Sequence, residues 1–339
     1  MKVSMKQISE ETGFSTATVC NALKHKYGVN PATAEKILKK ADELGYKANS
    51  REVSIGRVRL LILKKTGLII DNSPFFPSLI EGVEQQSKTM GMEILLTTLS
   101  MNAPDYERRM EEILRDASTA LIVLGTELEE NDYRCFTKAV CPIIILDSAS
   151  RTYPFDSVQI NNEETVASVV QYLLDRGHPK IGFIRGSIRI KAFLERSKGL
   201  RGALAAAGLK AEPIITVGTT TETAYSDMVK YLQTRPKLPT AFFADDDAIA
   251  LGAMRALKEN GVHIPKDVSL IGFDDLAFGE ISSPRLTTVH VFKEEMGRMA
   301  VRRMFDHINL GSTINAKILV YTNFIERDSV RDLRENTTR

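Results

Sequence analysis

The feature that most constrains the fold is a regular alternation of short apolar runs with amphipathic stretches, from Val58 to about residue 273. It is typical of β-α-β units, in which helices cover a parallel sheet, so the predicted fold class is α/β. The expected strands span residues 58–63, 94–98, 120–124, 143–146, 180–184, 213–217, 241–244 and 268–273. The expected helices span residues 75–90, 105–115, 162–176, 195–207, 221–233 and 247–260. Because about ten strands are many for one doubly wound sheet, we expect two such units side by side in this chain of 339 residues.

The N-terminal residues show a different pattern, three short helices at residues 5–12, 16–23 and 31–44. Gly13 ends the first helix, and Ser15 precedes the second, where its hydroxyl can cap the free N–H groups of the first turn. Asn30 and Pro31 begin the third. This order is that of a helix-turn-helix, whose second helix lies in the major groove of DNA. A helical bundle without a DNA role would show the same spacing, so the pattern alone leaves both interpretations open.

Charge is distributed unevenly along the chain, although the net charge is only +2. Residues 1–60 contain eleven lysines and arginines against six acidic residues, a net charge of +5, and the other 279 residues carry −3. A small basic region on a slightly acidic body indicates that a phosphate backbone, if one is bound, is bound by the N-terminal region.

Signals for enzymatic chemistry are missing from the sequence. The chain has no phosphate-binding loop, no serine-hydrolase motif and no zinc-protease motif. The five histidines are scattered, and the three cysteines have no metal-ligand spacing, so we expect structural histidines and reduced thiols. Asp245, Asp246 and Asp247 could be metal ligands or could begin a helix, where carboxylates are favoured. We therefore expect no enzyme, no catalytic residues, no metal and no cofactor.

The N-terminal segment and five further motifs, in the same order and at the same spacing, carry a resemblance to a known family. The segment MKQISEETGFSTATVCNALKHKYGVNPATAEKILKKADELGYKAN, residues 5–49, resembles the DNA-binding headpiece of the LacI/GalR family of transcription regulators. Similar family patterns follow as SPFF at 73–76, ERSKGLRGAL at 195–204, DDAIALGA at 246–253, DVSLIGFDD at 267–275 and PRLTTV at 284–289. The resemblance covers essentially the whole chain.

The resemblance implies a small all-helical helix-turn-helix headpiece, a hinge and two Rossmann-like subdomains of periplasmic-binding-protein type. In this numbering the headpiece is residues 1–46 and the hinge 47–57. The N-terminal core subdomain would be residues 58–160 with 291–320, and the C-terminal one residues 161–290 with 321–339. A small ligand would lie between the subdomains, at the carboxyl ends of the strands.

The second helix carries the residues that match the family's specificity positions, Thr16, Ala17 and Asn21. Asn21 can bond bidentately to adenine, whereas Ala17 and the Thr16 methyl can contact only apolar base edges such as a thymine methyl. Four further residues would hold phosphates and set the register without reading sequence: Lys6, Ser15, Thr18 and Asn30.

Two segments depart from the family's pattern. The hinge lacks the usual Ala-Arg-x-Leu, although Ile55 could supply the apolar wedge that unstacks a base step in the minor groove. Val53 cannot replace an arginine and Gly56 is a poor helix former, which puts hinge-dependent DNA bending in doubt. The segment 60–71 is longer than usual, and we expect its extra residues to form a solvated turn.

The effector-binding residues implied by the resemblance are Phe75 or Phe76, Arg196, Asp246 and Asp274, and Asp147, at the end of a strand, is expected to add another acceptor. A guanidinium, carboxylates and an aromatic face suit a sugar or related polyol, with a nucleoside or purine as the alternative. The family more often has Asn at the position of Asp246, so a ligand with an amine or many hydroxyls is favoured over a phosphorylated one. Two structural roles compete with this assignment: Asp274 could cap the turn before Leu276, and Arg196 could form an ion pair on a helix surface.

The expected partners are a pseudo-palindromic DNA operator, a small-molecule effector and a second copy of the chain, because one short recognition helix covers too few bases for specificity. The family's dimer surface involves the helix near Phe75, which makes Ile80, Val83 and Gln86 candidates, unless they pack on their own sheet. No membrane partner is expected, since no apolar run approaches the roughly 18 residues that span a bilayer.

Two other classes of protein share the body of this fold. A sugar-binding transport protein would need an export signal, and no apolar segment follows the first lysines. An enzyme with a nucleotide cofactor would need a phosphate loop. We therefore expect a cytoplasmic regulator that acts as a repressor, and the sequence does not say whether the effector releases DNA or tightens its binding.

Overall fold

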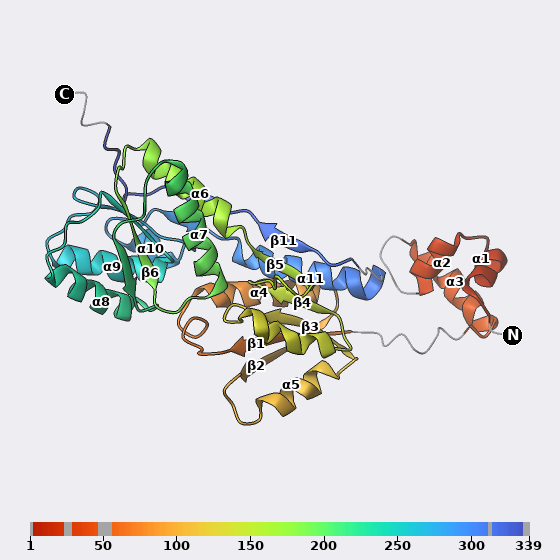
Figure 1. Ribbon diagram of the computed structural model, residues 1–339. Helices are drawn as coiled ribbons and strands as arrows, with labels where there is room; N and C mark the ends of the chain where they lie inside the picture. Colours follow the sequence, from red (N-terminus) through yellow and green to blue (C-terminus); the bar gives the residue numbers. More distant parts are fainter. Residues whose placement is uncertain (1–2, 24–28, 47–55, 311–313, 335–339) are drawn as a thin grey trace. The chain divides into compact units, whose positions relative to one another are not determined.

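The computed structural model describes residues 3–23, 29–46, 56–310 and 314–334, and the chain divides into two compact units, Met1–Ser54 and Ile55–Arg339 (Figure 1). Each unit is described by itself. In the part of the chain that is described, no helix is both long and apolar enough to cross a membrane.

The first unit contains the three predicted helices, α1 (Met5–Thr12), α2 (Thr16–Leu23) and α3 (Pro31–Glu43). Gly13 ends α1 with a left-handed φ of 72°, as its lack of a side chain allows. The Ser15 hydroxyl accepts a hydrogen bond from the Thr18 N–H at 3.1 Å, and Asn30 Oδ1 accepts one from the Ala32 N–H at 2.9 Å. Both predicted caps are therefore confirmed. The small core of this unit consists of Ile8, Val19, Ala22, Ile37 and Ala41.

The second unit contains a six-stranded parallel sheet in the order β11-β5-β4-β3-β1-β2, which we call the first sheet. Its strands are β1 (Arg57–Lys64), β2 (Glu93–Ser100), β3 (Thr119–Leu124), β4 (Ile143–Leu146), β5 (Asp156–Ile160) and β11 (Lys317–Val320). Helices α4 (Phe75–Thr89) and α11 (Lys293–Leu310) cover one face, and α5 (Tyr106–Leu114) and the 3₁₀ helix η1 (Glu130–Lys138) cover the other. Alternate β1 residues point to the two cores, Leu60 to one and Leu61 to the other.

The same unit contains a four-stranded parallel sheet in the order β7-β6-β8-β9, the second sheet. Its strands are β6 (Ile181–Gly186), β7 (Ile214–Val217), β8 (Ala241–Ala244) and β9 (Ser269–Ile271). Helices α6 (Asn162–Asp175) and α7 (Lys191–Ala206) pack against one face, and α8 (Thr221–Gln233) and α9 (Asp247–Glu259) pack against the other (Figure 1). The prediction of two parallel sheets covered by helices is confirmed.

The chain passes repeatedly between the two sheets. β5 belongs to the first sheet and leads directly into α6, and β11 returns to the first sheet after α11. β10 (Thr288–His290) and β12 (Asn323–Ile325) form a separate antiparallel pair, preceded by the short helix α10 (Ala277–Ile281). The boundaries proposed for the two subdomains stay a prediction.

Glycines allow pairs of helices in the second unit to approach closely. A Cβ atom at Gly82 of α4 would lie 2.0 Å from the Glu294 carbonyl oxygen of α11, and one at Gly297 would lie 2.4 Å from the Leu79 carbonyl oxygen. Such distances are far inside van der Waals contact, so the two backbones touch where the helices cross.

One predicted boundary was wrong in a way that affects the candidate site. Helix α7 begins at Lys191, not at residue 195, so Arg196 lies in its second turn. The prediction missed the first turn because it started the helix at the family motif.

Candidate functional site

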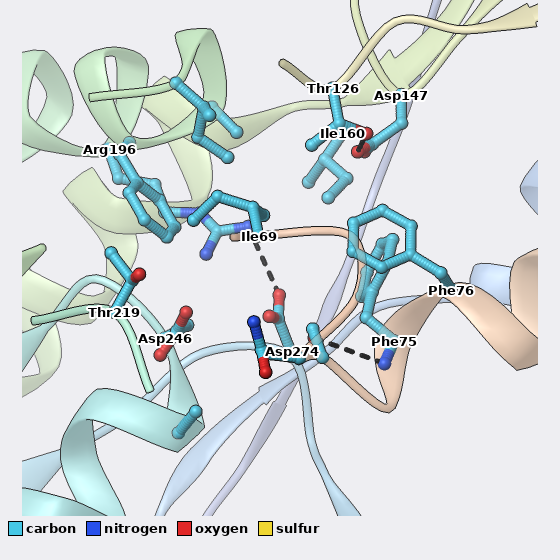
Figure 2. A pocket seen from close by; sticks show the side chains of 16 residues that line it. Ile69, Phe75, Phe76, Thr126, Asp147, Ile160, Arg196, Thr219, Asp246 and Asp274 are labelled. Atoms are coloured by element: carbon cyan, nitrogen blue, oxygen red, sulfur yellow. Dashed lines mark hydrogen bonds and ion pairs between the residues drawn. The ribbon is translucent and has the colours of Figure 1, made fainter. Parts of the chain in front are cut away.

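A cavity lies at the carboxyl ends of the parallel strands, and we call it the central cavity. All six residues predicted to bind an effector line it: Phe75, Phe76, Asp147, Arg196, Asp246 and Asp274 (Figure 2). Asp147 follows β4, Asp246 follows β8, and the two phenylalanines begin α4. The β-α-β topology therefore brings together residues that are up to about two hundred positions apart. That they bind an effector stays a prediction.

Arg196 is the best-connected side chain of the central cavity and is only 3% exposed. Its Nε donates to Asn162 Oδ1 at 3.0 Å, its Nη1 to the Asp245 carbonyl oxygen at 2.5 Å and its Nη2 to Asp274 Oδ1 at 3.2 Å. The guanidinium also lies 3.6 Å from the centre of the Phe273 ring. The alternative that Arg196 forms an ion pair on a helix surface is therefore wrong.

Asp274 follows strand β9 of the second sheet and accepts a hydrogen bond from Arg196 in the same network. Its φ of 106° is unusual for a residue with a side chain, and its backbone is fixed because its N–H donates to the Val289 carbonyl oxygen at 2.9 Å. Its carboxylate faces Arg196. The Leu276 N–H bonds to Asp247 Oδ2 at 2.8 Å, so Asp274 is not the cap of that turn.

The three consecutive aspartates after β8 have three different roles. Asp245 accepts hydrogen bonds from the Gly186 N–H and from Arg189. Asp246 caps α9, because its Oδ1 accepts from the Ile249 N–H at 2.8 Å, and Asp247 bonds to Thr288. The interpretation of this acidic run as a helix start is confirmed for Asp246. Among the described residues, no group of side chains could hold a metal ion.

Asp147 lies in the wall formed by the first sheet. Its φ of 61° is left-handed, a conformation that Asp and Asn tolerate better than most residues. Its Oδ2 accepts a hydrogen bond from the Thr126 hydroxyl at 2.7 Å. Thr126, at the end of β3, was not predicted, although a polar residue directly after a buried strand was a usable signal.

Burial raises the pKa values of the carboxyl groups around the central cavity, because the low-dielectric surroundings disfavour the charged form. The pKa rises to about 7 for Asp147 and Asp247 and to about 6 for Asp245. The pKa of Asp246 is raised well above its ordinary value, first by burial and then by the nearby charge of Asp274. Burial around the central cavity therefore disfavours the charged forms of these carboxyl groups.

The segment between β1 and α4 is held by a residue that the sequence analysis did not single out, Glu127. Its Oε2 accepts from the N–H groups of Lys65, Thr66 and Gly67 at 2.8 to 2.9 Å. Its Oε1 accepts from the next N–H groups, those of Ile69 at 3.1 Å and Ile70 at 3.4 Å. Although burial by itself raises the pKa of Glu127, these hydrogen bonds hold it below its usual value.

The expectation of a solvated turn in this segment holds only in part. Thr66, Leu68 and Asp71 are exposed, whereas five backbone N–H groups bond to the carboxylate of Glu127, a residue that is 6% exposed. The segment carries Ile69 into the wall of the central cavity (Figure 2). A glutamate shortly after a buried strand was the available signal.

The side chains predicted to contact DNA lie on the first unit. Thr16 and Ala17 are exposed on α2, and Asn21 is half-buried one turn later. Four residues predicted to hold phosphates are also at or near the surface: Lys6, Ser15, Thr18 and Asn30. Ile55 lies outside the described residues. These DNA contacts stay predictions.

One of the three residues suggested for a dimer contact is placed elsewhere. Val83 has no exposed surface and packs in the core between α4 and the first sheet, so it cannot face a partner. Ile80 and Gln86 are half-buried on α4.

Comparisons with known proteins agree with this architecture. Residues 170–330 match the periplasmic binding protein-like domain. The chain is 30% identical to the HTH-type transcriptional repressor PurR of Vibrio atlanticus (strain LGP32), over 97% of this chain and 99% of the relative. It superposes with a TM-score of 0.72 on a complex of the transcriptional regulator CelR with cellobiose, at 25% identity over 97% of this chain and 100% of that chain. It superposes with a TM-score of 0.71 on a lac repressor dimer bound to operator and the anti-inducer ONPF, at 19% identity over 98% and 100% of the two chains. The chain belongs to the LacI/GalR family of transcription regulators.

Proposed function

We propose that this chain is a repressor that binds a pseudo-palindromic operator as a homodimer, and that a sugar in the central cavity changes its affinity for that operator. The observation that carries the proposal is the combination, in one chain, of a helix-turn-helix unit and a cavity lined by all six predicted residues. The repressor assignment is supported by the relative from Vibrio atlanticus, whose name describes an HTH-type transcriptional repressor. Such a protein acts on the chromosome, and we infer that it works in the cytoplasm.

DNA recognition falls to α2 in this proposal. Its exposed residues Thr16 and Ala17 make no contribution to the small core, which leaves them available to base edges. Asn21 offers the amide that can bond bidentately to adenine. Ser15 and Asn30 use their side-chain oxygens as helix caps. In this proposal, the backbone N–H groups at these two helix starts face the phosphates.

A homodimer is supported by the apolar surface of the second unit. Phe278 and Ile281 on α10 are 62% and 78% exposed, an arrangement that costs free energy in a monomer. Together with the outer face of α4, they are our candidates for the contact between copies. A two-fold dimer presents two copies of α2 to two half-sites.

The sugar assignment follows from the chemistry of the cavity wall. Phe75 and Phe76 pack edge to face at 5.2 Å between ring centres and offer apolar surface, while Asp147 and Asp274 offer acceptors for hydroxyl groups. The CelR neighbour is described as a cellobiose complex, which supports the same class of ligand. A nucleoside or purine, which would stack on the same rings, is the alternative.

Two measurements on the full chain test this proposal. A gel shift with the DNA upstream of the chain's own operon should show a specific complex, and Asn21→Ala should weaken it. A thermal-shift screen of sugars, sugar phosphates, nucleosides and purines should find ligands that raise the melting temperature, because binding to the folded state stabilises it. If no specific DNA complex forms with or without these compounds, the regulator function is wrong. If only nucleosides or purines bind, the sugar assignment is wrong and the alternative holds.

A further inference from the structure

The central cavity has more carboxyl groups than cations to pair with them. Asp147, Asp246 and Asp274 line it, whereas Arg196 is the single basic residue among the described residues of its wall. All three nitrogens of that guanidinium already donate hydrogen bonds, and its carboxylate partner is Asp274. Arg196 is therefore already paired with Asp274, although its Nη1 and Nη2 each keep a second N–H for a ligand.

The other basic side chains near the cavity are also engaged elsewhere. Arg189 pairs with Asp245, and Lys191 pairs with Glu195. Lys293 donates to the backbone carbonyl oxygens of Asp274 and Val291, not to a carboxylate. Within the described residues, Asp147 and Asp246 thus have no cation within ion-pair distance.

Of these two carboxyl groups, Asp246 indicates more clearly which chemical group a ligand must carry. It is 9% exposed, and its Oδ1 is occupied by the Ile249 N–H at the start of α9. No described residue donates a hydrogen bond to its Oδ2, and the side chain lies in the cavity wall on the side away from Asp147 (Figure 2). A buried carboxylate without a cation to pair with is costly, and a ligand in the cavity can supply that cation.

We propose that the effector is an amino sugar, whose free protonated amine pairs with Asp246 while its hydroxyl groups bond to Asp147 and Arg196. This proposal rests on the effector function proposed above and names the ligand class. The ammonium group would donate to Asp246 Oδ2 and pair with a carboxyl group that has no ion-pair partner among the described residues. Its positive charge would oppose the burial and the Asp274 charge that raise the pKa of Asp246. A phosphorylated sugar would add negative charge beside three carboxyl groups and is disfavoured.

The test compares ligands that differ only in the amine, using calorimetry on the full chain. The pairs are glucosamine with glucose, galactosamine with galactose, and the β-1,4-linked dimer of glucosamine with cellobiose. We expect at least one amine to bind about tenfold or more tightly than its hydroxyl analogue, as a charge-assisted bond requires. N-acetylation of that amine should abolish the preference, because the acetamide carries no charge.

Asp246→Asn sharpens the comparison because Asn is as good a helix cap as Asp, so the bond to the Ile249 N–H and the start of α9 are kept. This variant should lose the preference for the amine and bind the neutral analogue at least as tightly as before. Asp105→Asn, a half-exposed carboxylate outside the cavity, is the control and should change neither affinity.

Each outcome decides the proposal. Equal or tighter binding of the neutral sugars by the wild type overturns the amine assignment and leaves the regulator function standing. A preference for the amine that survives in Asp246→Asn overturns the role of Asp246. If no member of any pair binds, the amino-sugar assignment is wrong, and the regulator function is then judged by its DNA complex alone.

Discussion

The helix-turn-helix unit and the central cavity place their functional side chains in opposite ways. On α2, Thr16 and Ala17 point away from a small apolar core and touch little else. In the cavity, Arg196 and Asp274 are almost fully buried and hold each other. The contrast teaches that the residues predicted to read DNA can change without disturbing the fold, whereas the cavity residues support the fold and, in our proposal, also set the ligand specificity.

The largest expected effect is on stability and comes from breaking the buried pair. Arg196→Ala leaves Asp274 and Asn162 without their partner, and should lower the free energy of unfolding of the second unit by about 3 to 5 kcal/mol. Thr16→Ala, the matched change on α2, should stay within about 0.5 kcal/mol. Urea unfolding followed by circular dichroism measures both. A loss below about 1 kcal/mol at Arg196 would mean that the buried network does not support the fold.

The next effect concerns the carboxylate of Glu127. Glu127→Ala removes the acceptor of five backbone N–H groups and should cost about 3 kcal/mol, because buried donors are left unsatisfied. Glu127→Gln keeps one acceptor oxygen and should cost less. Hydrogen exchange at the amides of residues 65–70 should quicken most in the Ala variant. Unchanged protection there would show that the segment is held by something other than Glu127.

A smaller effect on binding is expected from α2. Asn21→Ala should weaken operator binding by about 1 to 3 kcal/mol and relax the preference at one base position. Its half-buried side chain contributes little to the core, so the melting temperature should hardly move. Binding to a set of operators with single base changes measures the preference. The same preference in wild type and variant would remove Asn21 from base recognition.

The smallest effect is a pH dependence that only the cavity should show. Since burial raises the pKa of Asp147 from 3.8 to about 7, the folded chain binds more protons than the unfolded chain between about pH 4 and 7. Stability contributed by this group is therefore lost as pH rises through that window, by about 1 kcal/mol or more. Asp147→Asn should remove this pH-dependent contribution to stability, because the amide does not titrate. It should keep the fold, since Asn also tolerates the left-handed backbone. The free energy of unfolding of wild type relative to Asp147→Asn should fall between pH 5 and 8. A constant difference would contradict the raised pKa.

Sequence patterns predicted the regular parts of the fold well and the irregular parts poorly. Apolar runs such as β3 and β4 are buried on both faces and were found within a residue of their observed bounds. β5 was missed because polar residues interrupt it, and η1 because a 3₁₀ helix has a different period. β11 was missed because it lies beyond residue 273, where the alternation of strands and helices was no longer followed. Helix α11 should have been found, since Met296, Ala300 and Met304 recur every four residues and are buried.

The candidate site shows the same limit. The family resemblance implied that Arg196 and Asp274 lie near one cavity, and the structure brings both to its wall. The resemblance did not predict which carboxylate Arg196 pairs with, since that depends on side-chain packing between segments distant along the chain. Glu127 was missed because its partners are backbone N–H groups, which no sequence motif marks, so its place shortly after a buried strand was the available signal.

The central claim is that the cavity controls DNA binding, and one titration tests it most directly. Fluorescence anisotropy of a labelled operator should be measured with the full chain, without ligand and with a saturating amount of the ligand that raises its melting temperature most. The account predicts that the ligand changes operator affinity by about fivefold to a hundredfold, in either direction, as coupling between two sites typically does. A ligand that stabilises the protein but leaves operator affinity unchanged would contradict it.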